Sequence, residues 1–239
     1  MKRFAFMAAA GLVLACAGLA AGQTVDDVLK NMSAKAETIK DLNVSAAVTK
    51  YDSTFEKKTQ MRLELWYKKG DEKTRVDTFK KMPNGTEVQT QLVIIGKDFV
   101  LRATPEDKKA ELRKIPADEM KAARENRNDP MTFFTRKPED VKKDFDVALV
   151  ATTRPNCVKL VLKPKNPKTI EYKAVELTID KATWLPCVVR TMTGGEEDDW
   201  AQYEFTKVLL NTYFPDVVFM TPPGYDVKEV AKDAPDSKK

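Results

Sequence analysis

The densest group of side chains that could do chemistry in this sequence is residues 194–199, which read GGEEDD. Clustered carboxylates can hold a divalent cation or act as acid and base. The common calcium loop spaces its ligands at alternate positions, with a glycine midway and a glutamate at the twelfth, and this segment lacks that spacing. Successive strand side chains also alternate between faces, so four carboxylates cannot converge on one ion. We expect an exposed turn between two strands, with a weak cation site as the alternative.

The remaining residues offer little catalytic machinery. The chain has no histidine, which excludes Ser-His-Asp and Cys-His constellations and histidine-containing zinc sites. Neither a G-x-S-x-G motif nor a phosphate-binding or dinucleotide-binding glycine loop follows a predicted strand. Carboxylates are plentiful, but their spacing selects no acid and base pair. We therefore predict that the protein is not an enzyme and uses no cofactor and no metal.

Cysteine is rare, and two of the three cysteines, Cys157 and Cys187, lie in predicted strands. If these strands are separated by one other strand, the two residues lie roughly 9–10 Å apart, which is too far for a disulfide. We expect two buried, small apolar side chains, although an oxidising compartment would permit a bond.

The N-terminus, residues 1–22, has the pattern of a secretory signal peptide. Two cations precede an apolar run, and small residues lead to a cleavage site before Gln23. An alternative is that the segment ending at Cys16 serves as a lipoprotein signal, which would make Cys16 a lipid anchor. We expect residues 23–228 to form one folded domain and residues 229–239 to be a disordered charged tail.

The net charge of the expected mature chain is small. Without the leader, 39 Lys and Arg stand against 36 Asp and Glu, a net charge of +3, and the cations are scattered in pairs. This pattern gives no basis for nucleic-acid binding. Polar residues on the outward strand faces predict a monomer.

Hydrophobic periodicity predicts an α+β fold. Residues 24–42 have the spacing of an amphipathic helix capped by Thr24. About eleven strands of period two follow between Met61 and Met220, with a hairpin turn at Asn84-Gly85 and a helical insert at 116–143. So few helices cannot cover a flat sheet of that size, which predicts one large curled antiparallel sheet, a half-open β-barrel.

Several segments, in this order, resemble the periplasmic lipoprotein-carrier family of which LolA is the namesake. They are VDDVLKNMSAKAETIKDL, LELWYKKGDEKTRVDT, LVIIGKDFVLRATPEDKKAELRKI, AVELTIDKATWLPCVVRTM and YFPDVVFMTPPGYDVKEV, and together they cover about residues 24–228. The resemblance implies a half-barrel with helices across its mouth and an apolar cavity for lipid acyl chains. It also implies that acylated lipoproteins or lipids are partners, with an inner-membrane transporter and an outer-membrane acceptor.

The cavity implied by the resemblance would be lined by apolar side chains of the strands and of the helical insert. The expected lid residues are Met131, Phe133 and Phe134. The expected wall residues are Leu63, Leu65, Tyr67, Leu92, Ile94, Leu160, Leu162, Leu177, Tyr203 and Phe205. The alternative for each residue is an ordinary core position.

Three functional hypotheses follow. The first is a periplasmic carrier or chaperone that binds acyl chains and delivers them to the outer membrane of a Gram-negative cell. The second is a regulatory lipoprotein sensor with the same fold. The third is an envelope protein anchored through Cys16.

Overall fold

The computed structural model describes residues 22–120, 133–134, 136–167, 170, 172–193 and 198–231. Within these ranges the chain forms a twelve-stranded sheet with few helices. The helices are α1 (Val25–Glu37), α3 (Pro138–Asp144) and the 3-10 helix η2 (Asp216–Phe219). The strands are β1 (Asp41–Asp52), β2 (Lys57–Lys68), β3 (Lys73–Lys81), β4 (Glu87–Ile95), β5 (Phe99–Thr104), β6 (Lys109–Lys114), β7 (Phe145–Val150), β8 (Cys157–Pro164), β9 (Ala174–Asp180), β10 (Leu185–Met192), β11 (Trp200–Leu210) and β12 (Asp226–Val230).

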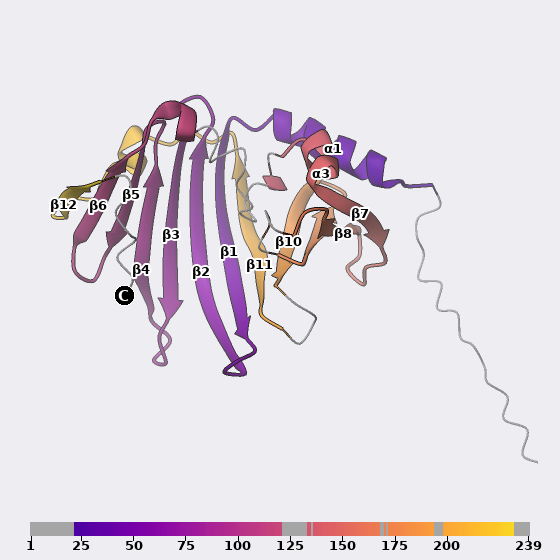
Figure 1. Cartoon of the computed structure of the whole chain (residues 1–239), viewed down its shortest axis with the longest axis horizontal. Helices are drawn as coiled ribbons and strands as arrows, with labels where there is room; N and C mark the ends of the chain where they lie inside the picture. Colours follow the sequence, from indigo (N-terminus) through magenta and orange to yellow (C-terminus); the bar gives the residue numbers. More distant parts are fainter. Residues whose placement is uncertain are drawn as a thin grey trace, which may run out of the picture.

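The sheet is open and curled, which confirms the predicted fold class. Its strand order is β12-β6-β5-β4-β3-β2-β1-β11-β10-β9-β8-β7, and every pair is antiparallel except β12 with β6. Figure 1 shows α1 and α3 gathered at the β7–β10 end of this row. No helix in the described ranges has the length and apolar content needed to span a bilayer.

Local sequence explains several connections. The predicted turn at Asn84-Gly85 joins β3 to β4, and Gly85 has a φ of 83°, which a residue without a Cβ adopts readily. The turn is closed by hydrogen bonds from the Gly85 N–H to the Met82 carbonyl (2.9 Å) and from the Met82 N–H to the Thr86 carbonyl (2.8 Å).

Three expected elements need correction. The amphipathic helix ends at Glu37, and β1 begins at Asp41 and continues to Asp52, a strand that the sequence pattern did not predict. Residues 213–220, expected as the last strand, contain the 3-10 helix η2 instead. The last strand is β12, which ends at Val230 and was not expected as a strand.

The strand register defines two faces of the sheet. A row of paired residues on β2, β1, β11, β10, β9 and β8 shares one face: Met61, Val48, Tyr203, Val189, Leu177 and Leu160. We call it the helix-side face, because α1 packs there through Val28, Leu29 and Met32. The opposite, outer face carries Arg75 and Asp77 of β3. The segment that contains η2 crosses this outer face, where the Arg75 guanidinium donates to the Val218 carbonyl at 2.9 Å.

The cysteines lie closer together than expected. The sulfur atoms of Cys157 and Cys187 are 4.0 Å apart, although β9 separates their strands. A local irregularity of the sheet accompanies this approach of the two sulfur atoms. β10 contains a bulge in which Pro186 pairs with Ile179 and Val188 with Thr178, leaving Cys187 as the extra residue. Both thiols are free and half-buried, not buried as expected.

Candidate functional site

The predicted lid and wall residues lie in three buried clusters. The cluster under α1 contains Phe133, Leu160, Leu162 and Leu177, with Tyr203 and Phe205 partly buried against it. The second cluster contains Leu65 and Phe134, with Leu63, Tyr67 and Phe205 partly buried against it. The third contains Leu92 and Ile94. Met131 lies outside the described residues.

Leu92 and Ile94 do not share a wall with the other predicted residues, which corrects the expectation. Leu92 pairs with Asp77 and Ile94 with Arg75, so both lie on the outer face, whereas Leu65 lies on the helix-side face. The neighbouring residues Val93 and Ile95 are also apolar. With both faces of the strand apolar, alternation cannot indicate which face turns toward the helices.

The two described phenylalanines of the insert pack onto the sheet. Phe134 is 2% exposed, and its ring meets that of Phe205 edge-on with centroids 4.8 Å apart. The ring of Phe133 lies 6.2 Å from the ring of Phe145. Tilted and edge-on rings are favourable arrangements that add to the burial of apolar area. These contacts cover the helix-side face near Leu65 and Phe205 with the protein's own side chains.

The helix-side face is not covered along its whole length. Beyond Tyr203 and Met61, toward the β1–β2 hairpin, lies a pocket of about 500 Å³. Its lining combines strand residues of the helix-side face with residues at the strand ends. The lining residues are Lys50, Tyr51, Asp52, Thr59, Met61, Tyr172, Thr191, Thr193, Asp199, Trp200, Ala201 and Tyr203. We call this space the open-end pocket.

The register explains why these residues converge. Lys50 pairs with Thr59 on one side and with Ala201 on the other, and Ala201 also pairs with Thr191. Met61 and Tyr203 lie two residues further along the same face, opposite Val48. The floor is therefore apolar and aromatic, whereas the mouth carries hydroxyl and charged groups.

Hydrogen bonds at the mouth join the two connections that border it. Oδ1 of Asp199 accepts from the backbone N–H and from the hydroxyl of Ser53, each at 2.7 Å. These bonds lower the pKa of Asp199 from its usual value. Thr193 donates its N–H to the Asp199 carbonyl at 3.0 Å. The turn before β2 is thus held to the connection between β10 and β11.

The acidic segment lies within the described residues at Asp198 and Asp199. Asp199 acts as an acceptor for Ser53, which is a structural role, and residues 194–197 lie outside the described ranges. Among the described residues, no group of three or more His, Cys, Asp or Glu side chains could hold a metal ion.

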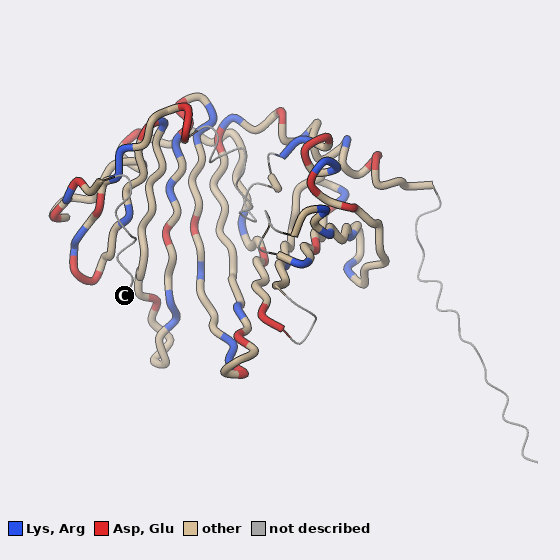
Figure 2. The backbone as a smooth tube through the Cα atoms, viewed as in Figure 1, with Lys and Arg blue, Asp and Glu red and all other residues tan. Residues whose placement is uncertain are grey.

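Aromatic and cationic groups border the pocket on the outer side. The rings of Tyr51 and Trp200 stack with centroids 5.9 Å apart, and the Arg190 guanidinium lies 4.7 Å from the Trp200 ring. Figure 2 shows cations and anions interspersed along the strands, without a block of one sign among the described residues at this end.

Of the predicted site residues, Tyr203 lines the open-end pocket. Met61 and Ala201 also line it, each two residues from a predicted site residue and on the same strand face as that residue. Tyr172, Thr191 and Trp200 were missed, because their positions depend on which strands become neighbours across the central β1–β11 pair. Long-range pairing of this kind leaves no local signal.

Comparison with known proteins bears on the fold. No family model and no curated protein matches the chain. An uncharacterized conserved protein from Thermus thermophilus is similar to it, with 13% identity, a TM-score of 0.53, and coverage of 87% of this chain and 100% of that one. A protein described as a putative outer membrane lipoprotein-sorting protein domain from Vibrio parahaemolyticus has 14% identity and a TM-score of 0.40, with coverage of 81% and 94%. A LolA superfamily protein from Nitrosomonas europaea has 11% identity and a TM-score of 0.37, with coverage of 80% and 97%. At these identities the likeness shows the fold alone, and among these three it is the Thermus structure that supports it.

Proposed function

We propose that this protein binds lipid acyl chains in the open-end pocket and carries them through the periplasm toward the outer membrane. The observation that carries the proposal is the apolar floor formed by Met61, Ala201 and Tyr203, which lines a pocket beside the part of the sheet face that α1 and the insert phenylalanines cover. A volume of about 500 Å³ lies within the range of small-molecule sites. The periplasmic location rests on the leader-like pattern of residues 1–22.

The driving force would be apolar burial. Each methylene that leaves water contributes about 0.8 kcal/mol, so a chain of several carbons provides useful affinity without a directional bond. Methionine and aromatic side chains adapt to a flexible chain and also release it. Lys50 at the mouth would meet an anionic head group.

The pocket adjoins the row of side chains that the insert covers. Tyr203 and Met61 form one row of the helix-side face, and Phe205 and Leu63 form the next row, paired through Ala46. Phe134 covers that second row through its edge-on contact with Phe205. Withdrawal of Phe134 would expose Leu63, Tyr67 and Phe205 to a longer ligand, which is the lid movement implied by the carrier hypothesis. The ligand would then be an acylated lipoprotein or a related lipid.

Titration with a fluorescent fatty acid tests the proposal. We expect saturable binding by the intact chain and at least about tenfold weaker binding by Tyr203→Glu, because a carboxylate on the pocket floor would lose its water when a chain enters. Tyr213→Glu is the matched control, since Tyr213 is 80% exposed on a different part of the surface. It should bind as the unmodified protein does. Absence of binding by the unmodified chain, or equal loss in both variants, would contradict the proposal.

A further inference from the structure

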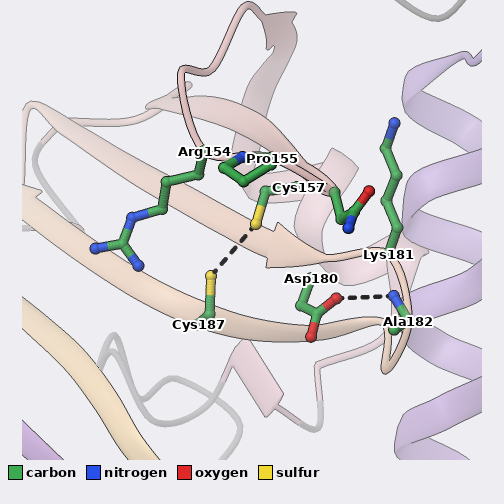
Figure 3. A pocket seen from close by; sticks show the side chains of 8 residues that line it. Arg154, Pro155, Cys157, Asp180, Lys181, Ala182 and Cys187 are labelled. Atoms are coloured by element: carbon green, nitrogen blue, oxygen red, sulfur yellow. Dashed lines mark hydrogen bonds between the residues drawn. The ribbon is translucent and has the colours of Figure 1, made fainter.

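Two thiols meet at the edge of a second pocket, away from the open-end pocket. The sulfur atoms of Cys157 and Cys187 lie 4.0 Å apart. Figure 3 shows them facing each other across the pocket, with Arg154 alongside. A pair of sulfurs in contact, reached from solvent, has a chemistry that an isolated buried cysteine lacks.

Both cysteines lie at irregular points of their strands. A disulfide needs sulfur atoms about 2.05 Å apart, so the contact must shorten by about 2 Å. Cys157 is the first residue of β8 and follows a turn in which Asn156 has a φ of 57°. Cys187 is the extra residue of the β10 bulge, outside the ladder pairing, and its sulfur lies 3.3 Å from the Thr178 carbonyl.

The surroundings allow an oxidant to reach the pair. Both cysteines are half-buried and line a pocket of about 790 Å³ together with Arg154, Pro155, Asn156, Asp180, Lys181 and Ala182. Arg154 interacts electrostatically with both sulfurs, although its guanidinium also donates to Glu204 at 2.5 Å. The charge of Arg154 partly offsets the increase that burial causes in the pKa of Cys187.

We propose that Cys157 and Cys187 form an intramolecular disulfide when the protein meets a disulfide oxidant. The sulfur of Cys157 attacks the oxidant, forms a mixed disulfide and releases one thiol. The sulfur of Cys187 then displaces the second thiol and closes the bond. Two protein thiols are oxidised and one external disulfide is reduced to two thiols, which carry the two protons.

The order of the steps follows from the protonation of Cys187. Burial, together with the adjacent Cys157, raises the pKa of the Cys187 thiol to about 11. Cys187 therefore stays protonated at neutral pH, which suits it to the second step. Once Cys157 is in a mixed disulfide it carries no negative charge, so its part of the increase in the Cys187 pKa is removed.

The bond would fasten β8 to β10 across the intervening strand β9. These three strands carry Leu160, Leu177 and Val189, which face α1 in the cluster on the helix-side face. A cross-link between residues separated by 30 positions also restricts the unfolded chain. We expect a higher melting temperature for the oxidised protein than for the reduced one.

The test uses the full-length chain with Cys16→Ser, so that the two thiols of interest remain. The reduced protein is incubated with oxidised glutathione, denatured and labelled with a maleimide. The expected result is loss of both labels, a mass lower by two hydrogens, and a cross-linked peptide that contains Cys157 and Cys187. Cys187→Ser is the control and should retain glutathione on Cys157, since no second thiol resolves the mixed disulfide.

Three outcomes would overturn the inference. They are two thiols that still react with maleimide, one glutathione on each cysteine, and a disulfide-linked dimer in place of the intramolecular bond. None of these results depends on lipid binding, so the test is independent of the proposed function.

Discussion

At the residue scale, a buried ion pair between Arg75 and Asp77 joins several elements on the outer face. The Arg75 guanidinium donates to both carboxylate oxygens of Asp77, at 3.0 and 2.9 Å, and Asp77 is buried. The same guanidinium lies 5.4 Å from the Trp66 ring and donates a hydrogen bond to the Val218 carbonyl. One arginine therefore links β2, β3 and the segment that contains η2.

Asp77→Asn tests whether the cost of burying the Asp77 carboxylate exceeds the stabilisation from its pairing with Arg75. Burial raises the pKa of Asp77, and the hydrogen bonds from Arg75 only partly oppose this. A carboxyl with a raised folded-state pKa binds its proton more tightly in the native state, so its contribution to stability decreases as pH rises. We expect the free energy of unfolding of the unmodified protein to fall relative to Asp77→Asn as pH rises above about 4, the usual pKa of an unfolded-state aspartate. Urea denaturation at a series of pH values measures this difference.

The control for that experiment is Asp118→Asn, because Asp118 is exposed and far from this ion pair in sequence. A difference between the unmodified protein and Asp77→Asn that rises with pH would contradict the expectation. It would mean that pairing with Arg75 outweighs the desolvation of the carboxylate.

The residue scale is also where the sequence was least informative about the site. Alternation placed Leu63, Leu65 and Tyr67 on one face of β2, and the structure agrees. Alternation could not predict which side chains of β4 lie on the helix-side face, because residues 92–95 are all apolar. Tyr203 was predicted for the wall and lines the open-end pocket, whereas the hydrogen bond between Thr193 and Asp199 at its mouth has no sequence signal.

At the scale of elements, α1 has a well-defined beginning. The Thr24 hydroxyl accepts from the Asp27 N–H at 3.2 Å, and the Asp27 carboxylate accepts from the Thr24 N–H at 3.0 Å. This reciprocal arrangement is a capping box, which satisfies N–H groups that have no partner within the helix. The helix is then held by Val28, Leu29 and Met32 against the sheet.

Thr24→Ala should weaken the protein without unfolding it. Removal of an N-cap side chain costs about 1 kcal/mol, and the buried face of α1 remains intact. Urea denaturation measures the loss. Ser33→Ala is the matched control within the same helix, and it should cause no loss because alanine has the higher helix propensity. Equal losses in the two variants would show that the capping box contributes nothing.

The Asp27 carboxylate makes the stabilisation by the capping box dependent on pH. Hydrogen bonds from Thr24 lower the pKa of Asp27. The stabilisation by this carboxylate is present above its unfolded-state pKa and is lost as pH falls through the folded-state value. The effect of Thr24→Ala should therefore be smaller in acid than at neutral pH.

Strands with a strong alternation of apolar and polar residues could be predicted from the sequence. Strands that form only because a neighbouring strand pairs with them could not. The residues of β8 alternate in burial as the sequence indicated. In β1 the small residues Ser45, Ala46 and Ala47 reduce the contrast between faces, so this central strand was missed. β12 consists mainly of charged residues and is a strand because it pairs in parallel with β6.

At the scale of the whole molecule, the curl of the sheet decides where a ligand can lie. The number of strands against so few helices predicted a curled sheet, and the structure has one. The sequence could not predict where on this sheet the open-end pocket lies. α1 and the two phenylalanines fill the helix-side face around Leu65 and Leu160, and the open-end pocket begins only beyond Tyr203.

This division of the sheet predicts where a bound lipid changes the dynamics of the molecule. A ligand that binds the native state adds stability locally, and hydrogen exchange reports such changes segment by segment. We expect a saturating fatty acid to slow amide exchange at the pocket ends of β1, β2, β10 and β11, near Lys50, Met61, Thr191 and Tyr203. Exchange in β4–β6 should not change, because their apolar cluster lies on the outer face. With Tyr203→Glu the same concentration of fatty acid should leave all of these strands unaffected. Slower exchange confined to β4–β6 would place the ligand at these strands and exclude the open-end pocket as its site.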